Sequence, residues 1–211
     1  MKGTSSKRKF IIASVIVGVV LLGAIISVVA VLAAGTQNLT SQVTVTYTVE
    51  DVSATVGVRY AVKNEAVQTG GSLTFTADQA EQAGGTGVTD TLTAIGELEL
   101  SSTNNFVTFE YSFQNNGTLA FDATLTGIPE TVNNMTLSWA KSTSKTDSLD
   151  GVTGFQTFTA DTIANVTAEV AGDADVSDDS HPITYIYIRA TITDLNVGAS
   201  LSGNFAWKLA A

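Results

Sequence analysis

The sequence predicts an all-β protein: an antiparallel β-sandwich of the immunoglobulin-like or jelly-roll type, preceded by one hydrophobic N-terminal helix. Short runs in which apolar and polar residues alternate recur along most of the chain. This period of two is typical of strands that bury one face. Turn signals rich in Asn, Gly and Asp separate the runs, and one segment, residues 77–85, has the composition of a helical turn.

The hydrophobic helix is expected over residues 10–34, which contain no charged residue and no proline. At 1.5 Å per residue it would be roughly 37 Å long, enough to cross a hydrocarbon core of about 30 Å with some tilt. Residues 1–9 carry four basic side chains that favour the cytoplasmic side of a membrane: Lys2, Lys7, Arg8 and Lys9. The pattern therefore predicts that the chain after residue 34 is extracellular, at the cell surface.

Two fates of this segment stay open. Its length favours a retained transmembrane anchor, because a cleavable signal peptide has an apolar region of about 7–15 residues. The small residues Ala33 and Ala34 suit signal cleavage, which would release the chain from the membrane. In both cases residues 35–41 are expected to form a polar spacer, and residues 42–211 are expected to form one extracellular domain.

Charge and cysteine content narrow the functions open to this domain. Four of the 10 basic residues lie before residue 10, so the exported part has six basic residues against 20 acidic ones. Such a surface repels nucleic acid, and binding to nucleic acid is not expected. The chain has no cysteine, which excludes disulfides and thiol catalysis. The chain has four glycosylation sequons, which carry little weight because two or three are expected by chance in a Ser- and Thr-rich chain: Asn38, Asn116, Asn134 and Asn165.

The first strand of the domain is expected over residues 42–49, where threonines alternate with Val43, Val45, Tyr47 and Val49. A second alternating run, residues 56–62, follows a short turn, and the two segments are expected to form an antiparallel hairpin. Residues 89–101 fit either two short strands or an irregular edge. Further strands are expected near residues 73–75, 106–113, 119–125, 135–139, 155–158, 166–170, 183–195 and 201–209. An Asn-Asn-Gly turn at 115–117 predicts a second hairpin.

The chain offers little for catalysis, and we expect it not to be an enzyme. Its one histidine, His181, precedes Pro182, whereas zinc hydrolases need at least two histidines and a general base. A Ser-His-Asp triad would need the same histidine, and no Gly-x-Ser-x-Gly motif presents a serine. Glu97, Glu99 and Glu110 alternate with apolar residues on strands, so we expect them to face solvent.

An acidic loop at residues 172–180 is the best candidate for an ion site. Four aspartates lie in it: Asp173, Asp175, Asp178 and Asp179. Ca²⁺ prefers several hard oxygen ligands gathered in one loop. The spacing differs from that of an EF-hand loop and lacks its final glutamate, so a solvated acidic turn is the competing interpretation. No other cofactor is expected.

Residues 109–120, with the sequence FEYSFQNNGTLA, resemble the matching hairpin of the TasA/camelysin family. Members of that family are exported β-sandwich proteins of Gram-positive bacteria that are found in surface and biofilm fibres. The order of a long apolar leader, a Val- and Thr-rich strand, an Asn-Gly turn and a last strand with Phe205 and Trp207 is also similar. The aromatic, acidic stretch that follows the family's leader is missing here, as are the metal ligands that the protease activity ascribed to camelysin would need.

The resemblance implies a fibre subunit, and the composition of the first strand is compatible with polymerisation. Residues 42–49 are uncharged and rich in β-formers, which makes an unpaired edge a template for pairing. A released strand could complete the sheet of the next copy and place Val43, Val45, Tyr47 and Val49 in its groove. One alternative is that this strand pairs with residues 56–62 of its own domain. Another is a membrane-anchored adhesin that does not polymerise and binds a cell-surface ligand through loops 141–151 and 172–180.

Overall fold

The computed structural model describes residues 36–50, 52–76, 88–95, 98–177 and 180–211. The chain divides into two compact units, Met1–Thr36 and Gln37–Ala211, and the second unit is the domain described below. The predicted hydrophobic helix, its cleavage candidates Ala33 and Ala34, and the predicted turn at 77–85 lie outside the described residues. In the part of the chain that the structure describes, no helix is long and apolar enough to cross a membrane.

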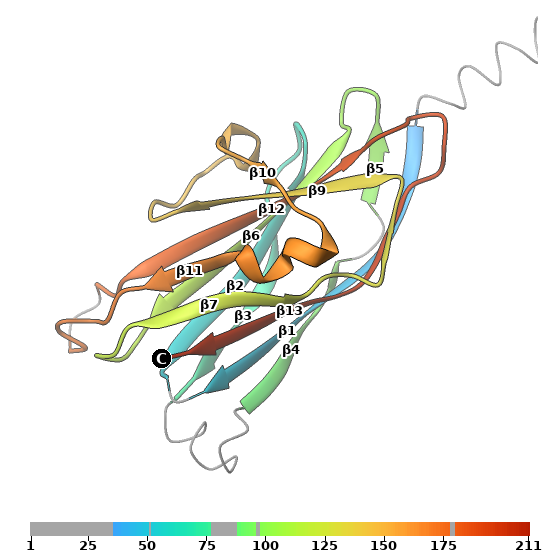
Figure 1. Cartoon of the computed structure of the whole chain (residues 1–211). Helices are drawn as coiled ribbons and strands as arrows, with labels where there is room; N and C mark the ends of the chain where they lie inside the picture. The colour runs from blue at the N-terminus through green and yellow to red at the C-terminus, as the bar shows by residue number, and fades with distance from the viewer. Residues whose placement is uncertain (1–35, 51, 77–87, 96–97, 178–179) are drawn as a thin grey trace, which may run out of the picture. The chain divides into compact units, whose positions relative to one another are not determined.

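The domain is all-β and consists of two sheets, as the alternating pattern predicts (Figure 1). The described residues form one sheet of seven strands and one of six. The seven-stranded sheet contains, in order, β11 (Thr167–Val170), β7 (Phe121–Gly127), β13 (Ser200–Ala210), β1 (Thr36–Glu50) and β4 (Val88–Ile95), with β5 (Leu98–Ser101) beside β1 and β8 (Thr131–Asn133) beside β13. The six-stranded sheet contains, in order, β10 (Gln156–Thr157), β9 (Met135–Ser142), β12 (Ile183–Ile192), β6 (Phe106–Asn115), β2 (Ala54–Val62) and β3 (Gln68–Phe75). Residues 89–101 thus belong to two short strands, one of the two expected alternatives.

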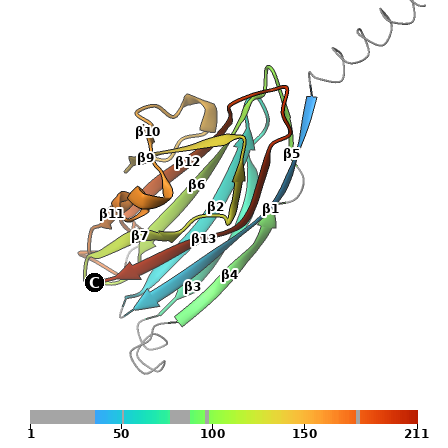
Figure 2. The ribbon, with the colours of Figure 1, turned by 45° about the vertical axis from the view of Figure 1, so that its right-hand side comes forward.

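Strand β1 lies inside its sheet, between β13 and β4 (Figure 2). It runs parallel to β13, where Val45 is paired with Phe205, and antiparallel to β4, where Val45 is paired with Leu92. The first and last described strands of the domain therefore point in the same direction. Because of this pair the sandwich is not wholly antiparallel, which corrects the expected class in this detail.

Both expected hairpins are wrong, because in each case the two segments lie in different sheets. β1 belongs to the seven-stranded sheet, whereas β2 pairs with β3 and β6 in the six-stranded sheet. In the same way β6 and β7 lie in opposite sheets, so the turn at 115–117 crosses from one sheet to the other. An alternating pattern shows which face of a strand is buried, and two such faces can meet across the core of a sandwich as well as side by side.

The strand β1 also begins earlier than expected, at Thr36, so most of the predicted spacer at 35–41 is part of it. Leu39 is fully buried in the core, and Thr40 is paired with Ser200 of β13. The burial of Leu39 and the continued pairing with β13 therefore extend the strand into a segment that is polar in composition.

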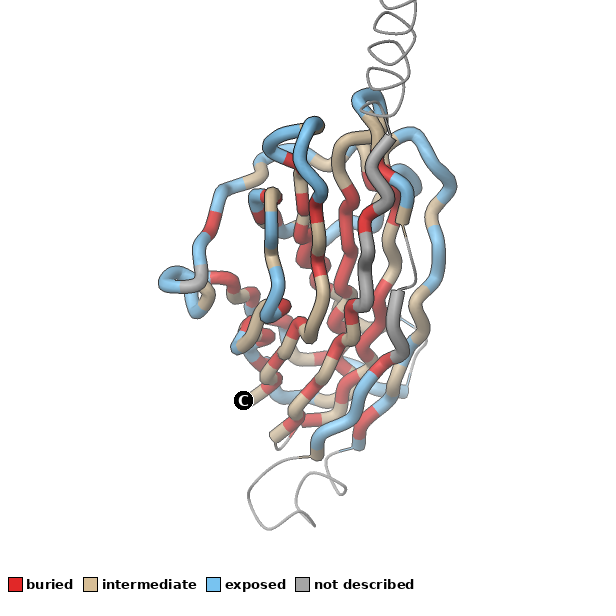
Figure 3. Tube along the Cα trace, turned by 90° about the vertical axis from the view of Figure 1, so that its right-hand side faces the viewer, coloured by how far each residue is buried: buried red, intermediate tan, exposed pale blue. Residues whose placement is uncertain are grey.

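The core fills the space between the two sheets, and buried positions alternate along the strands (Figure 3). Beneath β1 and β13 the sheets meet through aromatic rings. Tyr47 of β1 contacts Phe113 of β6 edge-on, with ring centroids 6.4 Å apart. Trp207 of β13 packs on Phe113 and Tyr111, at 5.0 and 5.1 Å. Aromatic pairs of this geometry stabilise a core beyond their buried area.

Candidate functional site

The predicted assembly strand is well integrated in the domain. Its four apolar residues are at most 1% exposed: Val43, Val45, Tyr47 and Val49. The threonines between them form a ladder of hydroxyl contacts with β4, since Thr46 meets Thr91 and Thr48 meets Thr89, both at 3.0 Å. The prediction of one buried and one threonine-lined face is confirmed.

The expected alternative that this strand pairs with residues 56–62 of its own domain is wrong. β13 and β4 flank β1, so it is an inner strand of its sheet. Its longest ladder is with β13, at the other end of the chain, and the side chains of Thr44 and Asn204 that meet across it are 160 positions apart. The groove that holds β1 is therefore made by strands distant from it in the sequence.

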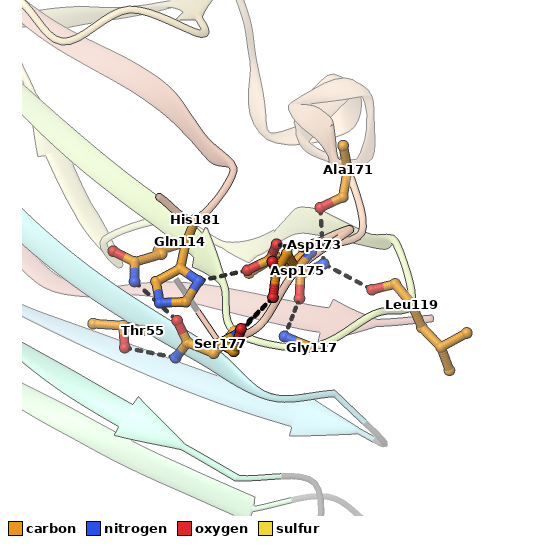
Figure 4. A network of polar contacts seen from close by, with 11 residues as sticks. Thr55, Gln114, Gly117, Leu119, Ala171, Asp173, Asp175, Ser177 and His181 are labelled. Atoms are coloured by element: carbon orange, nitrogen blue, oxygen red, sulfur yellow. Dashed lines mark hydrogen bonds and ion pairs between the residues drawn. The ribbon is translucent and has the colours of Figure 1, made fainter. Parts of the chain in front are cut away.

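A polar network centred on Asn115 joins three segments at one end of the sandwich (Figure 4). The Asn115 side chain is fully buried, and its Nδ2 donates to the carbonyls of Leu119 at 2.7 Å and Ala171 at 3.0 Å. Its Oδ1 accepts from the Gly117 N–H at 2.8 Å. The side chain thus forms hydrogen bonds with backbone groups of the turn between the sheets and of the acidic loop. Both its nitrogen and its oxygen have partners, as the polar atoms of a buried amide require.

Two neighbouring contacts extend this network to β2. The backbone N–H of Asn116 donates to the Ser53 carbonyl at 3.0 Å, just before β2 begins. Its side-chain Nδ2 donates to the Thr55 hydroxyl at 2.9 Å. The Asn-Asn-Gly turn therefore connects the start of β2, the crossing between the sheets and the acidic loop through hydrogen bonds.

The acidic loop packs against this turn at Asp173, whereas its residues 174–177 are exposed. The Asp173 N–H donates to the Gly117 carbonyl at 2.9 Å, and the Asp173 side chain is buried. A Cβ on Gly172 would lie 2.2 Å from the Thr118 carbonyl oxygen, so this close approach of two backbones requires glycine. The expected solvated turn is therefore wrong for the part of the loop at Asp173.

The two described carboxylates of this loop, Asp173 and Asp175, form hydrogen bonds within the protein. His181 Nδ1 lies 2.5 Å from one Asp173 oxygen, and the other accepts from the Asp175 N–H at 3.0 Å (Figure 4). The hydrogen bond with His181 lowers the pKa of Asp173, and hydrogen bonds from Ser177 lower the pKa of Asp175. Asp178 and Asp179 lie outside the described residues. Within the described part of the chain, no three His, Cys, Asp or Glu side chains are grouped as metal ligands would be.

Glu110 is buried, which corrects the expectation that it faces solvent. Its carboxylate accepts two hydrogen bonds from Arg59 of the neighbouring strand, at 2.7 and 2.6 Å, and only 2% of its side chain is exposed. These hydrogen bonds raise the pKa of Arg59. Glu99 is exposed, as expected, and Glu97 lies outside the described residues.

The loop after β9 explains this burial. It folds back over the outer face of the six-stranded sheet through the short 3-10 helix η1 (Leu149–Gly151), and Arg59 donates to its Thr146 carbonyl at 3.0 Å. A second apolar cluster forms beneath it from five buried residues: Ala61, Ala140, Leu149, Tyr185 and Tyr187. The guanidinium of Arg189 lies between the rings of Phe106 and Phe155, 4.1 Å from each.

A hollow of about 260 Å³ lies beside this loop on the same face of the sheet. Gly57 leaves space at its floor, next to Ser112 on β6. Charged and polar side chains line it: Arg59, Glu110, Gln114, Lys145 and Tyr185. It is an open hollow with polar and apolar lining, slightly smaller than the roughly 300–1,000 Å³ of typical ligand pockets.

Sequence reasoning did not find the Asn115 network, the Asp173–His181 contact or the Arg59–Glu110 pair. The sequence did contain a signal for the Arg59–Glu110 pair. Arg59 and Glu110 are each the one charged residue of an alternating strand, and their charges are opposite. Comparison with known proteins gives no family model and no curated sequence that matches the chain.

Proposed function

We propose that this chain is a non-enzymatic extracellular structural protein, a subunit of a surface fibre or biofilm matrix that assembles by β-strand addition. In this proposal β1 is the exchanged strand and a second copy of the chain is the partner. The leader at 10–34 and the resemblance of residues 109–120 to the TasA/camelysin family support export and assembly.

The observation that carries the proposal is the position of β1. It is the first described strand, it fills its groove with four buried side chains, and the strands that make the groove come from later in the chain. An N-terminal strand with such partners can be supplied by another copy without rearrangement of the groove, as in domain swapping and donor-strand complementation. If each copy accepts β1 from one neighbour and donates its own β1 to another, the contact is head-to-tail, and it produces an open filament where the rotation between copies does not close a ring.

Deletion of β1 tests this proposal. The chain starting at Gly35 is expected to form fibres in negative-stain electron microscopy, and the chain lacking residues 35–49 is not. Since the shortened chain loses part of its core, circular dichroism with and without a synthetic peptide of residues 36–50 provides the second measurement. Restoration of the β spectrum by the peptide supports a strand supplied in trans. Fibres that persist after the deletion contradict the mechanism.

The hollow beside Lys145 favours a second candidate function. A domain that stays membrane-anchored and does not polymerise could use this polar cavity to bind a small hydroxyl-rich or charged group on the cell surface. A glycan array probed with the chain and with its Gly57→Val variant tests it, because a Cβ at Gly57 would lie 2.8 Å from the Ser112 hydroxyl. Binding that the variant loses supports this function, and an array without signal contradicts it.

A further inference from the structure

We infer that Asp90 prevents the outer edge of β4 from pairing with a second copy of the chain, and so restricts where copies of the domain can associate. In the described part of the chain, β4 ends the strand order of the seven-stranded sheet, on the far side of β1 from β13 (Figure 2). The inference goes beyond the proposed function, because it concerns a strand that is not exchanged. It applies to a single folded domain as well as to a subunit of a fibre.

The composition of β4 is that of a strand to which another strand readily adds. Asp90 is the one charged residue among its eight, and the others are Val, Thr, Leu, Ala and Ile. β-branched residues of this kind favour strands, and an uncharged, flat edge rich in them is a site of aggregation. Without Asp90, β4 would therefore be a template for a further strand.

Two contacts indicate that backbone groups of β4 point away from β1. The hydroxyls of Thr89 and Thr91 lie 3.0 Å from those of their partners on β1, Thr48 and Thr46. Side chains approach this closely at the non-hydrogen-bonded pairs of an antiparallel ladder. At such pairs the N–H and C=O groups face away from the partner strand, so Thr89 and Thr91 present theirs to the outer edge.

Asp90 affects this edge in two ways. Its carboxylate accepts a hydrogen bond from the Thr91 N–H at 2.7 Å, so one donor of the edge already has a partner. Its pairing with Tyr47 places the Asp90 side chain on the core-facing side of the sheet, where it is still exposed because the sheet ends here. A strand added to β4 would take this charge out of water, which is costly. Inward-pointing charges are one means by which proteins prevent edge-to-edge association.

The other outer strands of the described sheets have different protection. β10 is only two residues long. β3 has a register shift beside Gly71, whose φ is 113°, and irregularities of this kind disturb regular pairing. On β11, Glu169 is charged and its carbonyl accepts a hydrogen bond from the Thr184 hydroxyl at 3.2 Å. The protection of β4 depends on the side chain of Asp90.

Sedimentation velocity of the chain starting at Gly35, which contains the whole described domain, tests the inference. Asp90→Val is expected to self-associate at a concentration at least about tenfold lower than the parent chain, since a difference of about 1.4 kcal/mol in association gives that factor. Asp122→Val is the matched control. It makes the same change at an exposed position of β7, an inner strand of the same sheet, and leaves self-association at the parent level.

Two further variants show whether the edge of β4 is the surface involved. Asp90→Lys keeps a charge at the edge and is expected to behave like the parent chain. Thr91→Pro removes the outward N–H, and proline is tolerated on an edge strand where its nitrogen faces solvent. Added to Asp90→Val, it is expected to return self-association to the parent level. Circular dichroism checks that each variant keeps its β spectrum.

An Asp90→Val chain that associates no more than Asp122→Val overturns the inference. Association that persists when Thr91→Pro is added also overturns it, because it does not use the edge of β4. Failure of the proposed function has a different signature: the parent chain forms no fibres in negative-stain images, while the difference between Asp90→Val and Asp122→Val remains. Where the parent chain forms fibres, Asp90→Val is expected to bundle them side by side, and fibres that stay single overturn the inference.

Discussion

Asn115 stabilises more of the structure than its position in a polar turn suggests. Its fully buried amide donates hydrogen bonds to two backbone carbonyls and accepts one from a backbone N–H. We predict that Asn115→Ala lowers the free energy of unfolding by about 2–4 kcal/mol, because it removes three hydrogen bonds that contribute about 0.5–1.5 kcal/mol each. Urea denaturation measures the change. Asn133→Ala, an exposed amide on β8, is the control and should have an effect within about 0.5 kcal/mol.

Asp173 makes the stability of the same region depend on pH. The pKa of its carboxyl is lowered first by the hydrogen bond with His181, and that of Asp175 by Ser177. A carboxylate whose pKa is lower in the folded chain stabilises the fold above the unfolded pKa of about 3.9, and this contribution is lost as the pH falls through the folded pKa. The melting temperature is therefore expected to fall on acidification below about pH 4.

Asp173→Asn should reduce this fall, because the variant has no carboxyl to protonate at this position. Thermal melts followed by circular dichroism between about pH 5 and pH 2 give the comparison. Asp147→Asn, an exposed carboxylate outside the network, serves as the control. An acid dependence that is equally steep in Asp173→Asn and in the parent chain would contradict the role given to this contact.

At the scale of elements, the Arg59–Glu110 pair joins β2 to β6 beneath the loop after β9. We predict that Glu110→Ala lowers the free energy of unfolding by about 3 kcal/mol, because it leaves a partly buried guanidinium without its partner. The double variant Arg59→Met with Glu110→Leu should recover most of this loss, since apolar residues can replace a buried ion pair. Urea denaturation of the parent chain and the two variants tests this, and a double variant as unstable as Glu110→Ala contradicts it.

The positions of the strands could be predicted from the sequence, whereas the pairing of each strand with its neighbours in the sheet could not. The period-two pattern identified the buried faces of β1, β6 and β12 because this signal is contained within each strand. Pairing of β1 with β13 depends on residues 160 positions apart, which no local pattern contains. Glu110 looked like a surface charge because its burial depends on a distant loop that folds over it. The Asn115–Asp173 network likewise depends on contact between two loops far apart in the sequence, each of which connects one sheet with the other.

At the scale of the whole molecule, the proposed function is assembly through the pairing of strands between copies of the domain. The first and last strands lie side by side in parallel, and both contribute large side chains to one aromatic core. A strand taken from another copy would find the same core, the same threonine ladder with β4 and the same Asn204. Assembly therefore needs only an exchange of the chain that supplies β1.

A mixture of two single-cysteine chains tests this claim most directly. One chain carries Thr48→Cys and the other Lys208→Cys, positions that are paired in the observed register, and the parent chain has no cysteine. When the mixture assembles, the account predicts a disulfide between the two different chains, identified by mass, and no such product when Thr143→Cys on the exposed loop after β9 replaces Lys208→Cys. Fibres without a link between positions 48 and 208, or a mixture that remains monomeric, would contradict it.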